Sequence, residues 1–218
     1  MFKLYLDMKT LWIFDNDGTL YEDCLVGEYF SKILYEYLVK AYSFNLDEIP
    51  EKLKLLKLKW KTEFSIMALV REYNMDFHDL VNNTYLKINL ASCGVQTPDN
   101  HRFGILNSLK GKKIVFTNNP SSFAKYTLDY VQLSNCFSDF VGMEEMSFLG
   151  KPHPSCYRKI EDLYPGFDRI IFCDDSLKNL DAAKEFGWTT VWFNDKRKET
   201  NANFGHSMIS SFEELKSF

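Results

Sequence analysis

The chain has 218 residues, 45% of them hydrophobic and 26% charged, which is the balance of an ordinary globular protein with a sizeable core. Its net charge of −4 gives no global basic field for nucleic acid, and five scattered cysteines without metal-site spacing favour a reducing cytoplasm. No apolar run approaches the roughly 20 residues of a membrane span, and residues 1–8 are too short and too polar for a signal peptide. Their alternating apolar and polar side chains fit either an added edge strand or a disordered extension.

The first apolar segment, residues 10–14, is predicted to be a short buried strand that ends in two acids. Asp15 and Asp17 follow it, with Gly18 and Thr19 next. Open α/β sheets bind ligands at the carboxyl ends of their strands, where one carboxylate can attack while the other handles a proton. Both acids can also help to hold a hard cation. The alternative is a strand followed by an ordinary Asp-Gly turn.

From residue 21 to about residue 99 the pattern is helical throughout. Apolar residues recur at helical spacing through 26–37 and through 53–67, and further helices are predicted over 65–73 and 77–90. Because this region starts directly after the acidic loop, we expect an inserted helical lobe that serves as a lid. The lysines beside the second stripe indicate solvated helix edges, with an electrostatic funnel for anionic substrates as the alternative. These lysines are Lys52, Lys54, Lys57, Lys59 and Lys61.

From residue 112 onward, short apolar strands alternate with helices. This alternation predicts a parallel sheet with right-handed crossovers, which the first strand joins because an isolated strand is unstable. The expected strands are residues 114–117, 138–143, 170–173 and 189–193, and the expected helices are residues 121–132, 154–163 and 177–186. The expected fold is therefore α/β, with a doubly wound Rossmann-like core of residues 1–20 and 100–218 and an inserted all-helical cap of residues 21–99.

Distinctive polar residues follow three of these later segments. The hydroxyl of Thr117 and the backbone N–H of Asn118 can bind phosphate oxygens, although a helix cap is the alternative. Lys151 can neutralise a phosphoryl group, although most lysines are solvated surface residues. The pair Asp174-Asp175 suits Mg²⁺, and it can equally cap the next helix. Each signal is weak alone, but their order along the chain is specific, because the strand ends meet in a parallel sheet.

With these residues in view, the chain resembles the haloacid dehalogenase (HAD) superfamily, chiefly its phosphatases, over essentially its whole length. The segment 14–20, then Thr117, Lys151 and Asp174-Asp175, look like its four motifs in order. The resemblance implies a magnesium-dependent hydrolase that acts on phosphate monoesters through an aspartyl-phosphate. Asp15 would be the nucleophile, and Asp17 would protonate the leaving alcohol and then deprotonate water.

The resemblance also assigns the binding groups. Mg²⁺ would be held by the carboxylate of Asp15, the backbone carbonyl of Asp17 and Asp175, with Asp174 as the alternative to Asp175. The phosphoryl oxygens would be held by Thr117, the Asn118 N–H and Lys151. Dehalogenases of this fold lack an acid at the position of Asp17, since a halide leaves without a proton.

The fourth motif departs from the commonest family pattern. Asp174 stands where glycine is frequent, and Leu180 replaces a further acid. Together with Asn179, this form is similar to pyrimidine 5′-nucleotidase-like members, so nucleoside monophosphates are the favoured substrates. A phosphomutase, a sugar-phosphate or phosphoglycolate phosphatase, and a non-hydrolytic phospho-accepting or binding module remain alternatives. The expected partner is a small-molecule phosphate ester, with no nucleic acid polymer and no membrane.

Overall fold

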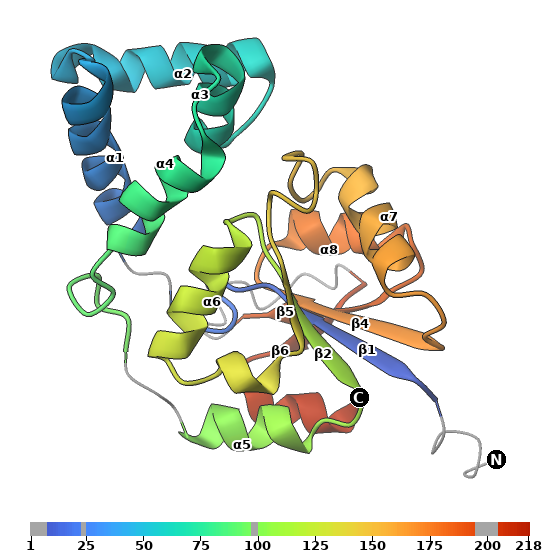
Figure 1. Cartoon of the computed structure of the whole chain (residues 1–218). Coiled ribbons are helices and arrows are strands. Elements are labelled where there is room, and N and C mark those ends of the chain that lie inside the picture. The colour runs from blue at the N-terminus through green and yellow to red at the C-terminus, as the bar shows by residue number, and fades with distance from the viewer. Residues whose placement is uncertain (1–7, 23–24, 97–99, 195–204) are drawn as a thin grey trace. The chain divides into compact units, whose positions relative to one another are not determined.

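A parallel sheet forms the centre of the computed structural model, which describes residues 8–22, 25–96, 100–194 and 205–218. The described residues form six strands in the order β3-β2-β1-β4-β5-β6, and every neighbouring pair is parallel (Figure 1). The strands are β1 (Thr10–Phe14), β2 (Lys112–Phe116), β3 (Asp139–Val141), β4 (Arg169–Asp174), β5 (Thr189–Phe193) and β6 (Ser207–Ile209). The doubly wound α/β core expected from the sequence is confirmed.

The central position of β1 determines which strand ends meet. Phe14, its last residue, pairs with Val115 of β2 on one side and with Cys173 of β4 on the other. The backbone N–H of Asp15 then continues the ladder by donating to the carbonyl of Cys173 at 2.9 Å. The residues that leave β1, β2 and β4 therefore lie side by side at one edge of the sheet.

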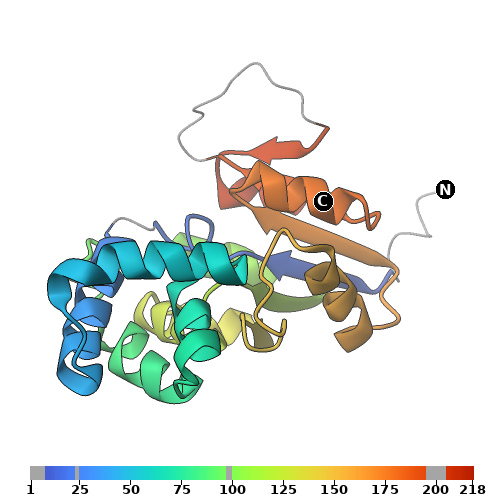
Figure 2. The ribbon, with the colours of Figure 1, turned by 90° about the horizontal axis from the view of Figure 1, so that it is seen from above.

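One face of the sheet is covered by helices α7 (Pro154–Leu163) and α8 (Leu177–Lys184). Leu11 and Ile13 of β1 lie on this face and are fully buried in the same cluster as Tyr157 of α7. Because side chains alternate along a strand, the neighbouring residues of β1 belong to the opposite face. Figure 2, which views the molecule from above, shows α7 and α8 beside the strands.

The opposite face of β1 is an aromatic layer. Phe14 packs edge to face against Phe137 at 5.8 Å and stacks on Phe212 at 6.3 Å between ring centroids. Phe212 begins the short helix η4 (Phe212–Ser217), which contacts helix α5 (Asn100–Ser108). Both faces of β1 are thus covered, as a continuous hydrophobic run in a parallel strand requires.

The chain divides into two compact units, one of residues 1–22 and 96–218 and the other of residues 23–95. The described part of the second unit consists of helices α1 (Val26–Tyr42), α2 (Ile49–Trp60), α3 (Ser65–Tyr73) and α4 (Phe77–Asn83) with short 3₁₀ turns. Its helices pack through their apolar faces, since Leu34, Leu38, Leu53 and Leu69 are at most 5% exposed.

Two helices of this unit differ from the sequence-based expectation. The apolar stripe through residues 53–67 belongs to two helices, because Lys61 adopts a left-handed φ of 50° that ends α2. The helix expected over 77–90 ends at Asn83 and is followed by the 3₁₀ turn η2 (Tyr85–Lys87). Periodicity alone does not register such breaks, because the apolar spacing continues across them.

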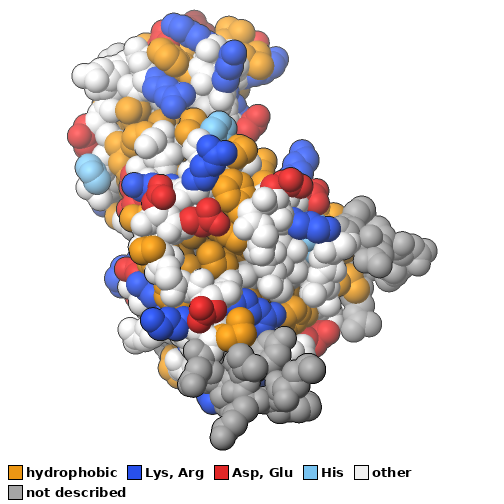
Figure 3. Space-filling model, turned by 90° about the vertical axis from the view of Figure 1, so that its right-hand side faces the viewer, with side chains coloured by type: hydrophobic (Ala, Val, Ile, Leu, Met, Phe, Trp, Pro, Cys, Tyr) orange, Lys and Arg blue, Asp and Glu red, His pale blue; other side chains and the backbone are white. Residues whose placement is uncertain are grey.

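Three lysines of helix α2 form ion pairs with nearby glutamates. The pairs join Lys52 to Glu48 (3.9 Å), Lys54 to Glu51 (3.2 Å) and Lys59 to Glu72 (2.6 Å). Figure 3 shows basic side chains, with some acidic ones among them, on one face of the molecule. The ion pairs favour the interpretation of the α2 lysines as solvated helix edges over an electrostatic funnel.

In the core unit, the sequence analysis missed α5, β6 and η4 and overran two helices. Helix α6 (Ser121–Tyr130) and α8 end two residues before the expected limits, and strand β3 is shorter than residues 138–143. The edge strand considered for residues 1–8 lies almost wholly outside the described residues. Within the described ranges, no helix combines the length and the apolar character that crossing a membrane needs.

Candidate active site

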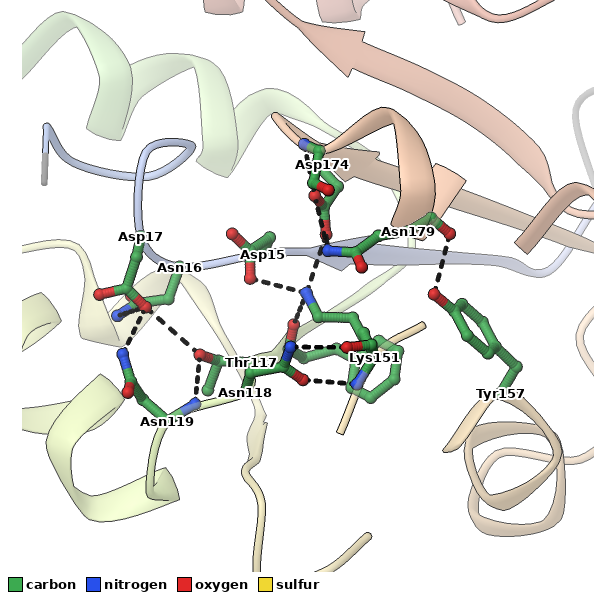
Figure 4. A network of polar contacts seen from close by, with 12 residues as sticks. Asp15, Asn16, Asp17, Thr117, Asn118, Asn119, Lys151, Tyr157, Asp174 and Asn179 are labelled. Carbon is green, nitrogen blue, oxygen red and sulfur yellow. Dashed lines mark hydrogen bonds and ion pairs between the residues drawn. The ribbon is translucent and has the colours of Figure 1, made fainter. Parts of the chain in front are cut away.

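A buried lysine joins two acids at the carboxyl ends of β1 and β4. Lys151 Nζ lies 2.7 Å from Asp15 Oδ1 and 2.8 Å from Asp174 Oδ2, and it donates to the backbone carbonyl of Phe116 at 2.7 Å (Figure 4). The side chains of Lys151 and Asp174 are at most 1% exposed, and that of Asp15 is 11% exposed. All three donor hydrogens of the ammonium therefore have acceptors.

These contacts govern the charges in the site. Burial alone would lower the pKa of Lys151, but the attraction of Asp15 and Asp174 outweighs burial and raises it above its usual value. Burial and repulsion from Asp174 and Asp17 raise the pKa of Asp15 well above its usual value, against the attraction of Lys151. The ammonium thus stays charged, and it does not fully offset the surrounding carboxylates.

The side chain of Asn118 positions Lys151. Its Oδ1 accepts from the Lys151 backbone N–H at 2.6 Å, and its Nδ2 donates to the Lys151 carbonyl at 2.9 Å. This two-point clamp joins the loop after β2 to the loop before α7. His153, to which the sequence analysis gave no role, caps α7 by accepting from the Ser155 N–H at its Nδ1 (3.2 Å).

Asp174 and Asp175 occupy different environments. Asp174 is fully buried and accepts from the Ser176 N–H at 2.8 Å and from Asn179 Nδ2 at 3.0 and 3.1 Å, besides Lys151. Asp175 is exposed, and its carboxylate lies beside the acidic loop, because a Cβ at Gly18 would come within 2.6 Å of its Oδ2. Although the residue as a whole is exposed, the crowded surroundings partly desolvate its carboxylate, and this desolvation together with repulsion from Asp174 raises the pKa of Asp175 to about 6.

The acids Asp15, Asp174 and Asp175 form a candidate metal centre. Each offers one carboxylate oxygen within 4.8 Å of the other two. The residues fit a divalent cation, because three carboxylates lie around one ammonium. Hard oxygen ligands of this kind suit Mg²⁺.

Asp17 lies on the other side of Asp15, next to the loop after β2 (Figure 4). Its Oδ2 accepts from Asn119 Nδ2 at 2.9 Å and, over a longer distance of 3.4 Å, from the hydroxyl of Thr117. The Thr117 hydroxyl also accepts from the Asn119 N–H at 3.1 Å. The structure therefore brings Asp17 and Thr117 into direct contact across 100 residues of sequence.

The acidic loop folds back on itself after Asp17. Gly18 has φ +77°, a left-handed conformation that glycine adopts without steric cost, and its N–H donates to the Tyr21 carbonyl at 3.0 Å. The Leu20 N–H donates to the Asn16 carbonyl at 2.9 Å. This turn keeps the side chains of Asp15 and Asp17 at the edge of the sheet.

The sequence analysis missed the amide and phenol side chains around the acids. Asn16 donates to Thr127 Oγ1 of α6 at 3.1 Å, Asn119 donates to Asp17, and the Tyr21 hydroxyl donates to Asp17 Oδ1. Asn118 was assigned only through its backbone N–H, while its side chain forms the clamp on Lys151. The only available signal was the adjacency of these residues to the motif positions, and adjacency does not indicate where a side chain points.

Comparisons with known proteins identify the family and the fold of the chain. The model of a hydrolase family, haloacid dehalogenase-like hydrolase, matches residues 10–187. The chain is also similar to solved structures that share its fold. A HAD phosphatase from Thermococcus onnurineus is 20% identical with a TM-score of 0.61, covering 96% of this chain and 97% of that one.

Two further solved structures are similar over nearly the whole chain. A 2-haloacid dehalogenase from Pseudomonas syringae pv. Tomato has 17% identity and a TM-score of 0.64, with 96% and 97% of the two chains covered. The HAD-hydrolase YfnB from Bacillus subtilis, described as bound to magnesium, has 17% identity and a TM-score of 0.56, with 97% and 98% covered. At these identities the likeness shows the fold alone. With the family model matching most of the chain, this protein belongs to the haloacid dehalogenase-like hydrolase family.

Proposed function

We propose that this protein is a magnesium-dependent phosphatase that hydrolyses small-molecule phosphate monoesters through an aspartyl-phosphate on Asp15. The observation that carries the proposal is the position of a second acid, Asp17, beside Thr117, on the opposite side of Asp15 from Lys151. The site then holds a nucleophile, Asp15, a proton donor, Asp17, and a positive charge, the Lys151 ammonium. These are the groups that phosphoryl transfer from an alcohol needs.

The first step uses Asp15 and Asp17 together. Asp15 Oδ1 is engaged by Lys151, whereas Oδ2 accepts no hydrogen bond from a described residue and is the oxygen available for attack on phosphorus. As the bond from phosphorus to the alcohol oxygen breaks, a proton from Asp17 passes to that oxygen. In the second step Asp17 takes a proton from water, which attacks phosphorus and releases Asp15 and phosphate.

Lys151, Thr117 and the Asn118 N–H stabilise the charge on the phosphoryl oxygens. Asp15, the Asp17 carbonyl and Asp175 would hold Mg²⁺, with Asp174 committed mainly to Lys151 and Asn179. When bound, the cation supplies charge neutralisation that brings an anionic ester close to the carboxylates. The exposed Asp175 supports this division of roles, because it has fewer protein partners than Asp174.

An oxygen leaving group is favoured over a halide by Asp17. A departing alkoxide needs a proton and a departing halide does not, so an acid held beside the nucleophile supports phosphoester hydrolysis. Nucleoside monophosphates are the substrates we favour, supported by the Asp174-Asp175 pair with Asn179 in this chain. Sugar phosphates, phosphoglycolate and phosphomutase substrates are the alternatives.

A hydrolysis panel tests the proposal. It contains nucleoside monophosphates, sugar phosphates, phosphoglycolate and 2-chloropropionate, each with and without MgCl₂, and reads out phosphate or chloride release. Phosphate release should need Mg²⁺ and should disappear in Asp15→Asn. Asp129→Asn is the matched control, because Asp129 is an exposed acid of α6 whose side-chain partners, Lys125 and Ser134, do not belong to the candidate site.

The outcomes separate the candidates. Chloride release without phosphate release would make the protein a dehalogenase and refute the proposal. Turnover that appears only with a bisphosphate activator would indicate a phosphomutase. A stable phosphorylated protein without turnover would indicate a phospho-accepting domain, and activity retained in Asp15→Asn would refute the nucleophile.

A further inference from the structure

The side chain of Tyr21 folds back onto Asp17. The turn that begins at Gly18 reverses the chain, and the Tyr21 hydroxyl donates to Asp17 Oδ1 (Figure 4 shows the Asp17 carboxylate). Tyr21 is 4% exposed, so its ring is packed in the core unit. A phenol held in this way restricts where the carboxylate can point.

The second oxygen of Asp17 is held from the other side. Asn119 Nδ2 donates to Oδ2 at 2.9 Å, while the Thr117 hydroxyl and Asn16 Nδ2 lie 3.4 Å from the same atom. Oδ2 is therefore surrounded by donors. Oδ1 accepts from the Tyr21 hydroxyl and can form one more hydrogen bond, so it is the oxygen that can contact a substrate.

The segment that carries Tyr21 is itself anchored. Arg102 of α5 donates to the Leu20 carbonyl at 2.7 Å, and its guanidinium lies 4.8 Å from the centre of the Phe212 ring. Leu20 is 1% exposed. The backbone that presents the Tyr21 hydroxyl to Asp17 is thus held by a charged group and by burial, and it does not depend on the Asp17 contact alone.

We propose that Tyr21 is a positioning residue which, opposite Asn119, holds Asp17 Oδ1 in line with the leaving-group oxygen. The inference rests on the proposed phosphatase activity. Tyr21 neither gives nor takes a proton. When the bond between phosphorus and the alcohol oxygen breaks, the proton passes from Asp17 Oδ1 to that oxygen, and Asp17 is left as a carboxylate. Without Tyr21, the carboxyl rotates and spends less time aimed at the leaving group.

The consequence is a rate effect that depends on the leaving group. A p-nitrophenolate ion departs without a proton, whereas the ribose alcohol of a nucleoside monophosphate needs one. General acid catalysis is worth roughly 10²–10⁴-fold, so a misaligned acid should cost about 10-fold or more with the alkyl ester. The nitrophenyl ester should lose far less, and KM should change little for both esters, since Tyr21 is assigned no contact with the phosphoryl group.

The experiment measures kcat/KM of Tyr21→Phe with p-nitrophenyl phosphate and with a nucleoside monophosphate, in saturating Mg²⁺. The parameter kcat/KM reports the first irreversible step, in which Asp17 acts as the acid. Tyr164→Phe is the matched control, because it also removes a phenol that bonds a carboxylate, Asp139, at the opposite ends of the strands. Asn119→Ala removes the opposing donor and should show the same selective loss.

The outcomes distinguish a failure of the positioning role of Tyr21 from a failure of the proposed phosphatase function. A loss confined to the alkyl ester in Tyr21→Phe, with Tyr164→Phe unchanged, supports the positioning role. Equal losses on both esters, or none on either, would overturn it while leaving the phosphatase proposal intact. If the unmodified protein hydrolyses neither ester, the proposed function fails, and the role of Tyr21 fails with it. Thermal melting of each variant checks folding, and Asn119→Ala decides the question if Tyr21→Phe does not fold.

Discussion

Replacing Lys151 by methionine should destabilise the protein strongly. Methionine keeps the unbranched stem but removes the ammonium that lies 2.7 Å from Asp15 and 2.8 Å from Asp174. At an effective dielectric constant of about 20, each contact has a gross attraction of about 6 kcal/mol. Much of this is offset by the desolvation of the three charges, and breaking a buried pair by removing one partner typically costs about 3–5 kcal/mol.

A loss of this size is a large part of the total stability of a domain, which is about 5–15 kcal/mol. We expect Lys151→Met to lower the free energy of unfolding by about 3–5 kcal/mol in urea titrations at pH 7 with EDTA, followed by circular dichroism. The raised pKa of Lys151 keeps the wild-type ammonium charged across the neutral range, so the reference state is well defined. The stability that Lys151 contributes through its raised pKa is fully present below the lysine pKa of the unfolded chain and is lost only at high pH.

Lys112→Met is the matched control, because Lys112 lies 2.7 Å from Asp139 in a pair whose side chains are 36% and 43% exposed. An exposed pair contributes about 0–1 kcal/mol. Adding Asp174→Asn to Lys151→Met should recover part of the loss, since one uncompensated carboxylate is then removed. Equal costs for the two lysine substitutions would refute the reasoning, because burial would then not govern the strength of the pair.

Three further predictions follow from buried or crowded atoms near the site. Because the pKa of Asp175 is raised to about 6, the folded protein binds its proton more tightly than the unfolded chain, and metal-free stability should fall as the pH rises from about 4 to about 6. Asp175→Asn should reduce that slope, to which the raised pKa of Asp15 also contributes, and should remove the rise in melting temperature with MgCl₂; an unchanged rise would contradict the metal centre. The fully buried Thr19 hydroxyl has no described hydrogen-bond partner, so Thr19→Val should raise the free energy of unfolding by about 1 kcal/mol in urea titrations. The matched substitution Thr127→Val removes two hydrogen bonds and should lower the free energy of unfolding by about 1–3 kcal/mol. Gly18→Ala should lower the free energy of unfolding by about 1–2 kcal/mol, because Gly18 has a left-handed φ. It should also weaken Mg²⁺ binding, measured by calorimetry, because the new Cβ meets the Asp175 carboxylate, and unaltered binding would argue against that contact.

Much of the core could be predicted from the sequence because local patterns determine it. The apolar runs of β1, β4 and β5 alternate with amphipathic helices, and this pattern alone indicates a parallel sheet. The elements that were missed lack such patterns. Helix α5 has no clear apolar face, and β6 is a three-residue edge strand whose residues are mostly exposed.

The candidate site was only partly predictable for a related reason. Acids and a lysine at strand ends are recognisable, because topology brings the carboxyl ends of parallel strands together. The amides and the phenol that hold them carry no comparable signal. Asn118 and Asn119 are adjacent in the chain, yet one clamps Lys151 and the other bonds Asp17.

The sequence by itself therefore determined the order of strands, helices and acids, because hydrophobic periodicity and the residues after each strand are local properties. The tertiary structure decided how each carboxylate is used. It placed Asp174 between Lys151 and Asn179, left Asp175 exposed, and aligned Asp17 between Asn119 and Tyr21. The contact of Asp17 with Asn119 joins residues 102 positions apart, and its geometry exists only once the strands have paired and the loops between them have packed.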